Sequence, residues 1–246
     1  LKNIPNLEYI DYYSDFSEEG VKIGALATLY DIGRSVIVTE RADVFIEAIK
    51  QRELRVNKTR WAYYMATIGG YLFSLESAAD IVPALMVLNA KAVMQGVQGW
   101  ATVPVEDLFS PKEEEEDKYE ILTEIRIPKI AESEVGLVYE KSVGAGGAPS
   151  IGAAILLRLD AKHVNVDEFR IVVGGTGAVA IESHEGAGIM KDNPIDDHLI
   201  IDAADMAADE VCAQCDDDTK ERTRDLIEEA IRHAIDRAIG DFALGY

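Results

Sequence analysis

One short segment of the sequence has the residue types that bind a phosphate group. The residues Ala66, Thr67, Ile68, Gly69 and Gly70 occur in a row, and we expect a short apolar strand to lead into the two glycines. Paired glycines let backbone N–H groups approach a pyrophosphate because no Cβ stands in the way. A helix that begins soon afterwards, at Ser77, would add a favourable dipole. Because Gly-Gly is also common in plain turns, a phosphate loop and a simple turn both remain open.

A second glycine-rich segment matches the dinucleotide-binding pattern G-x-G-x-x-A, at residues 175–180. That interpretation requires a helix to begin within the segment, after the apolar strand at 171–173. Instead, the apolar residues Ala178, Val179, Ala180 and Ile181 continue as a strand. We therefore predict a strand–turn–strand at this position and no nicotinamide site.

The sequence shows no catalytic acid, base or nucleophile and no metal site. Its four histidines lack the spacing of metal ligands: His163, His184, His198 and His233. The two cysteines, Cys212 and Cys215, are too few for a four-ligand zinc or iron–sulfur site. They end a helical segment and precede three aspartates that would raise a thiol pKa. Any chemistry must therefore come from a bound cofactor.

Composition and charge exclude several classes of protein. The chain has 246 residues, 48% of them hydrophobic, and a formal net charge of −21. That charge repels phosphate backbones and anionic lipid, so we expect neither nucleic acid nor membrane as a partner. The scarcity of cysteine indicates a reducing, cytoplasmic setting. Since the sequence begins at Leu1 without Met, we expect either a processed N-terminus or a fragment.

Apolar periodicity predicts an N-terminal unit of mixed helix and sheet. We expect a strand at residues 21–28 and a helix capped by Thr39 whose apolar positions are Ala42, Phe45, Ile46 and Ile49. A second helix should open at residues 77–80. Residues 91–98 and 100–105 read as a hairpin. The charged residues 111–118 are the best candidate for a linker.

A second unit should follow this linker. Residues 121–127 alternate like a half-buried strand, and we place that strand at the start of the second unit. Further strands are expected at 151–159 and 169–173, and helices at 200–211 and 225–239, the last ended by Gly240. The predicted fold class is α+β in two domains, residues 1–112 and 113–246.

Several segments, taken in order, resemble the FAD-binding medium subunits of molybdenum hydroxylases, the xanthine dehydrogenase and carbon monoxide dehydrogenase type. The segment 66–70, followed ten residues later by Asp80, resembles the second flavin loop of that family. Further similar stretches, with matching order and spacing, cover nearly the whole chain: 22–28, 103–109, 120–128, 149–154 and 169–175.

This resemblance implies a fold, a cofactor and partners. It implies a flavin domain of the vanillyl-alcohol-oxidase-like type, then a C-terminal domain of antiparallel sheet packed on helices. It also implies electron transfer from the [2Fe–2S] clusters of a small subunit, through FAD, to an acceptor, with the molybdenum cofactor in a large subunit. By position, the cofactor-binding residues would be Thr67, Ile68, Gly69, Gly70, Tyr71, Asp80, Leu122 and Lys141.

Some residues depart from the family pattern and keep two alternatives open. The family's earlier glycine-rich flavin loop has no counterpart in this sequence, and Tyr71 and Glu76 replace smaller polar residues. A carboxylate facing a phosphate is unfavourable. The first alternative is a flavin-free structural or interaction subunit of the same kind of complex. The second is a stand-alone flavin oxidase, which the C-terminal similarity disfavours.

Overall fold

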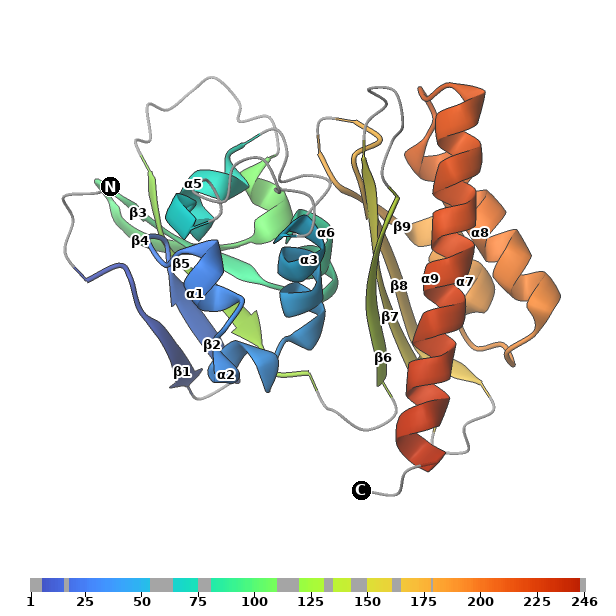
Figure 1. Cartoon of the computed structure of the whole chain (residues 1–246), viewed down its shortest axis with the longest axis horizontal. Helices are drawn as coiled ribbons and strands as arrows, with labels where there is room; N and C mark the ends of the chain where they lie inside the picture. Colours follow the sequence, from blue (N-terminus) through green and yellow to red (C-terminus); the bar gives the residue numbers. More distant parts are fainter. Residues whose placement is uncertain are drawn as a thin grey trace. The chain divides into compact units, whose positions relative to one another are not determined.

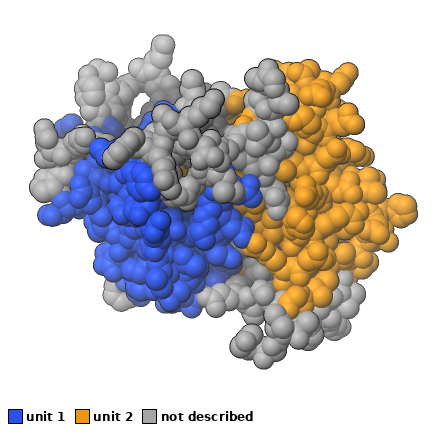
Figure 2. All heavy atoms as spheres, in the orientation of Figure 1, with its two compact units in different colours: residues 1–77, 88–130 blue, residues 78–87, 131–246 orange. Residues whose placement is uncertain are grey.

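The computed structural model describes residues 6–15, 18–53, 64–74, 81–109, 120–130, 135–142, 150–160, 165–177 and 179–243. The chain divides into two compact units (Figure 2), one of residues 1–77 and 88–130, the other of residues 78–87 and 131–246. The division is not a simple cut along the chain, because a ten-residue segment of the N-terminal half belongs to the second unit. Each unit contains one antiparallel sheet (Figure 1).

The first unit is built on a five-stranded sheet with the order β1-β2-β5-β3-β4. These strands are β1 (Ile10–Ser14), β2 (Glu19–Gly24), β3 (Lys91–Gly96), β4 (Gly99–Pro104) and β5 (Ile121–Pro128). Cross-strand neighbours Ile23 on β2, Ile125 on β5 and Ala92 on β3 form a fully buried row. The hairpin of β3 and β4 confirms the prediction for residues 91–105.

Strand β5 corrects the predicted domain layout. We placed residues 121–127 at the start of the second unit, but β5 pairs with β2 and β3 at the centre of the first sheet. Alternation reveals that a segment is a strand, yet it does not identify the strand's partners. The predicted linker, 111–118, lies outside the described residues.

The first unit also contains short helices. They are α1 (Leu29–Ile32), α2 (Val36–Thr39), α3 (Asp43–Glu53), α5 (Ile68–Leu72) and the 3-10 turn η2 (Val105–Leu108). The predicted apolar face of α3 is buried. Thr39, however, does not cap that helix. Thr39 is the last residue of α2, which Ser35 caps, and the Thr39 hydroxyl donates to the Ser35 carbonyl. Helix α3 begins only at Asp43, four residues later, so Thr39 is too far from its start to cap it.

The second unit has a four-stranded sheet covered by helices on both faces. Its strands are β6 (Val135–Ser142), β7 (Ile151–Leu159), β8 (Val166–Gly174) and β9 (Ile181–Ser183), paired in that order. Helices α7 (His184–Met190), α8 (Asp197–Val211) and α9 (Asp217–Ala243) cover one face (Figure 1). Helix α6 (Ile81–Val87) packs against β7 and β8, and all seven of its residues are buried.

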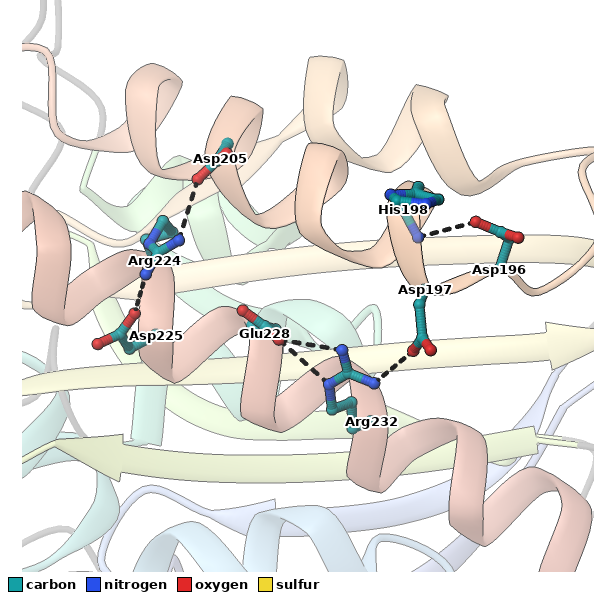
Figure 3. A network of polar contacts seen from close by, with 8 residues as sticks. All are labelled: Asp196, Asp197, His198, Asp205, Arg224, Asp225, Glu228 and Arg232. Carbon is teal, nitrogen blue, oxygen red and sulfur yellow. Dashed lines mark hydrogen bonds and ion pairs between the residues drawn. The ribbon is translucent and has the colours of Figure 1, made fainter.

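Helices α8 and α9 pack together through buried apolar residues. Figure 3 shows ion pairs between the two helices and within α9. Arg224 of α9 contacts Asp205 at 3.7 Å, and Arg232 contacts Asp197 at 2.7 Å and Glu228 at 3.0 Å. Helix α9 runs through Gly240 to Ala243, so the predicted end at Gly240 is wrong. A helical glycine costs only about 1 kcal/mol, which the packing of a long helix offsets.

Candidate functional site

The predicted phosphate-binding segment forms the start of a short helix rather than the end of a strand. Thr67 forms an isolated antiparallel bridge with Thr28, and α5 begins at the next residue. The Thr67 hydroxyl accepts the Gly70 amide at 3.2 Å. The two glycines are therefore the second and third residues of α5, close to its positive N-terminus.

The bridge joins two helix starts that have the same cap. Thr28 caps α1 as Thr67 caps α5, and in both cases the amide three residues later donates to the threonine hydroxyl. In α1 that third residue is Asp31, whose carboxylate accepts the Thr28 hydroxyl at 2.6 Å. In α5 it is Gly70, which is exposed and has no side chain. One helix start thus carries its own anion, whereas the other leaves that position open.

The backbone amides of α5 are not equally available to a ligand. The amides of Ile68 and Gly69 donate to the carbonyls of Ala27 and Ala25, each at 2.9 Å. The Tyr71 amide donates to the Thr67 carbonyl, also at 2.9 Å. Among the described residues, the Gly70 amide is bonded to the Thr67 side-chain hydroxyl alone, and that hydroxyl can rotate. A phosphate would therefore approach Gly70 and the Thr67 hydroxyl more readily than the other three amides.

The two glycines meet different surroundings. A Cβ on Gly69 would lie 2.9 Å from the Ala25 carbonyl oxygen, which no real Cβ tolerates. A Cβ on Gly70 would meet only the Thr67 hydroxyl oxygen, at 3.1 Å. Gly69 is thus required by the close approach of the chain after β2. Packing does not require glycine at position 70. Binding of a ligand beside this residue would explain why a side chain is absent there.

The remaining predicted cofactor residues are distributed over both units. Ile68 and Tyr71 are buried in the first unit, and Leu122 is buried on β5 beside Met94 of β3. Lys141 lies on β6 of the second unit, opposite Gly152. Asp80 lies outside the described residues, as do the predicted helix start at 77–80 and Glu76.

The competing glycine-rich segment is a strand–turn–strand as predicted, but its second strand begins later than expected, because residues 179 and 180 precede β9 instead of belonging to it. Strand β8 ends at Gly174, Gly175 has a positive φ of 90°, and the chain resumes as β9 at Ile181. The helix that follows, α7, begins only after β9. Its start is held by Glu210 of α8, which accepts the Ser183 hydroxyl and two backbone amides.

The two cysteines are structural. Cys212 is buried at the end of α8, and its thiol lies 3.3 Å from the Thr223 hydroxyl. Burial and the neighbouring Cys212 thiol raise the pKa of Cys215 to about 12, and Asp216 adds to the rise as predicted. A thiol with so high a pKa is a poor nucleophile. Within the described part of the chain, no three acidic, histidine or cysteine side chains gather as metal ligands.

Two further features were not predicted. The first is the pair of matching helix caps at Thr28 and Thr67. A repeated pattern in the sequence could have indicated them, Thr-x-x-Asp at 28–31 and Thr-x-x-Gly at 67–70. The contact of Arg170 had no local signal, because its partners are distant in sequence. Its guanidinium binds Glu182 twice, at 2.7 Å, and donates to the Val87 carbonyl at 3.1 Å.

Comparison with known proteins identifies the family. Residues 1–130 match the model described as the FAD binding domain in molybdopterin dehydrogenase. This match covers more than half of the chain, and it ends two residues after β5. The chain therefore belongs to this family of FAD-binding domains of molybdopterin dehydrogenases, which are oxidoreductases, and the predicted resemblance is confirmed.

Individual relatives are distant but extend over most of the chain. The glyceraldehyde dehydrogenase medium chain of Sulfolobus acidocaldarius is 25% identical over 213 residues, 86% of this chain and 72% of that one. The 6-hydroxypseudooxynicotine dehydrogenase complex subunit alpha of Paenarthrobacter nicotinovorans is 27% identical over 195 residues, 78% of this chain and 63% of that one.

Solved structures share the fold of both units. A chain of the carbon monoxide dehydrogenase from Hydrogenophaga pseudoflava superposes with a TM-score of 0.78 at 24% identity, covering 96% of this chain and 81% of that one. Quinoline 2-oxidoreductase from Pseudomonas putida gives 0.77 at 17% identity, covering 97% and 81%. The α+β class and the sheet-on-helix architecture of the second unit are confirmed. No helix among the described residues is long and apolar enough to cross a membrane.

Proposed function

We propose that this chain binds FAD and relays electrons within a molybdenum hydroxylase complex. The observation that carries the proposal is the open N-terminus of α5, where Gly70 takes the place that Asp31 fills with a carboxylate in α1. The Gly70 amide and the Thr67 hydroxyl would donate hydrogen bonds to the negatively charged oxygens of a pyrophosphate there. FAD, when bound, would supply the redox chemistry that the described side chains lack.

The protein residues have distinct roles in this proposal. Thr67 and Gly70 would contact the pyrophosphate. Gly69, Ile68 and Tyr71 would hold the loop against the chain after β2, through the bonds to Ala25 and Ala27 and through burial. We retain three further cofactor contacts as proposals from the family pattern: Asp80, Leu122 and Lys141.

The partners and the location are also proposals. Electrons would come from a small subunit with [2Fe–2S] clusters and ultimately from a large subunit with the molybdenum cofactor, in the cytoplasm. Two relatives are named as a medium chain and as subunit alpha of a complex, which supports assembly into a complex.

A flavin-free interaction subunit is the second candidate. One observation favours it: the backbone amides of Ile68, Gly69 and Tyr71 already bond within the chain. Three amides of the loop are therefore already bonded to backbone carbonyls without a ligand.

Flavin content of the native complex separates the two candidates. The complex would be purified through a tag on this chain, and the flavin released by denaturation would be identified and counted. We expect one FAD per chain, together with iron and molybdenum. A complex that contains both metals and no flavin would establish the interaction subunit instead.

A further inference from the structure

The tip of the β3–β4 hairpin exposes an apolar surface that the fold does not need. Val97 in the turn is 93% exposed, and Trp100 on β4 is 66% exposed. The positive φ of this turn, 121°, falls on Gly99, so the turn accepts most residue types at position 97 and does not demand an apolar one.

The sheet register extends this surface across three strands. Trp100 on β4 and Ile121 on β5 are both cross-strand neighbours of Gln95 on β3, so all three side chains lie on one face in a single row. Ile121 is 42% exposed. We call Val97, Trp100 and Ile121 the hairpin patch. A groove of about 520 Å³ runs beside it, lined by residues 96–101 and Glu120.

Strand β4 is, moreover, an edge strand that pairs, among the described residues, with β3 alone. It is the last strand of the first sheet, and five of its six residues are exposed. Edges that face water are usually protected by lysines or other charges, because bare edges recruit other chains. The sequence of β4, Gly-Trp-Ala-Thr-Val-Pro, contains no charged residue. An apolar patch and a bare edge at the same place indicate a surface that is covered in the working protein.

Charge defines the kind of partner that fits. The described residues of this stretch, 95–109 and 120–124, contain four acidic residues and no lysine or arginine. Among the described residues that line the groove, Glu120 is the charged one. We propose that the hairpin patch docks a partner subunit of the complex through an apolar projection surrounded by lysines and arginines. Buried tryptophans dominate the binding energy of such interfaces, and charges at the rim select the partner. This inference rests on the proposed function, since it names a contact of that complex.

Two substitutions in the patch test the proposal, with a matched control elsewhere. Val97→Asp and Trp100→Glu place a carboxylate in the patch, whereas Val36→Asp makes the same change at a residue of α2 that is 68% exposed. Each tagged chain would be expressed with its native partners, purified, and assayed for iron, molybdenum, FAD and melting temperature. We expect both patch variants to retain about tenfold less metal than the unmodified chain, with unchanged flavin and melting temperature. The Val36→Asp chain should retain iron, molybdenum and FAD at the level of the unmodified chain, with the same melting temperature.

A fluorescence measurement reports the contact directly. The chain has two tryptophans, Trp61 and Trp100, so Trp61→Phe leaves Trp100 as the single reporter. Acrylamide should quench Trp100 efficiently in the isolated chain and poorly in the complex. Equal quenching in both states would overturn the proposal.

The outcomes distinguish this inference from the proposed function. Patch variants that keep iron and molybdenum in full would refute the docking surface and leave the flavin proposal standing. A dimer of the isolated chain that Val97→Asp dissociates would assign the patch to a second copy and refute the partner subunit. If the unmodified chain carries FAD but neither metal, the docking proposal fails while flavin binding stands. Loss of metals in the patch variants of a flavin-free complex would support docking and refute the cofactor.

Discussion

At the scale of single residues, the two adjacent glycines of α5 separate folding from ligand binding. Gly69 is buried against the Ala25 carbonyl, and Gly70 faces solvent. The family pattern treats them as one Gly-Gly motif, but the close approach of the backbone explains only the first. A bound ligand would explain the glycine at position 70, which packing does not.

Gly69→Ala should therefore destabilise the fold whether or not flavin is present. The added methyl group would be forced to within 2.9 Å of a backbone oxygen, at a cost of about 1–3 kcal/mol. Denaturant unfolding of the apo protein measures this change. Gly240→Ala is the matched control, because a Cβ there meets nothing within 4 Å and alanine favours a helix. Equal effects of the two substitutions would refute the packing argument.

At the scale of elements, α6 links the flavin segment to the second unit. It follows Asp80 directly in sequence and lies within the match to the FAD-binding family, yet it packs against β7 and β8. Arg170 of β8 fixes its end through the Val87 carbonyl, and Glu182 of β9 fixes Arg170. Helix α6, which follows Asp80 in sequence, is therefore anchored by the C-terminal sheet.

Arg170→Met should destabilise the protein by about 2–4 kcal/mol, because Glu182 would remain only 20% exposed without its cation and the Val87 carbonyl would lose its donor. Thermal or denaturant unfolding measures the loss. Lys129→Met is the control, because the Lys129–Glu19 pair is more exposed and worth less than about 1 kcal/mol. A cost for Arg170→Met as small as that of the control would show that the contact does not anchor α6.

The sequence predicted elements better than their assembly. The strands at 121–127 and 151–159 and the face of α3 follow from local periodicity, which a single chain displays directly. The pairing of β5 with β2 and β3 and the docking of α6 on the second sheet depend on contacts between distant residues, which periodicity does not encode. The same limit applies to the site. Thr67 and the glycines were visible as a motif, but the bonds to Ala25 and Ala27 that occupy two of its amides were not.

At the scale of the whole molecule, the net charge of −21 should make stability depend on salt. Ion pairs such as those of Arg224 and Arg232 in Figure 3 are exposed and individually weak. Repulsion among 45 acidic residues acts over the entire surface. Screening by salt should therefore reduce the destabilising repulsion by more than it reduces the stabilising attraction of the ion pairs. We expect the melting temperature to rise between about 0.05 and 0.5 M NaCl, where the Debye length falls severalfold. A falling melting temperature would mean that the ion pairs outweigh the repulsion.

The most direct test of the central claim is the flavin content of Gly70→Asp. This change copies the Thr28–Asp31 cap of α1 onto α5, so the helix start should be at least as stable as before. The new carboxylate would occupy the position proposed for the pyrophosphate. Gly188→Asp is the control, at an exposed helical glycine of the second unit with nothing within 4 Å. We predict that Gly70→Asp loses FAD with no drop in melting temperature of the apo protein, while Gly188→Asp keeps FAD. Retention of FAD by Gly70→Asp at the level of the unmodified chain would contradict the account.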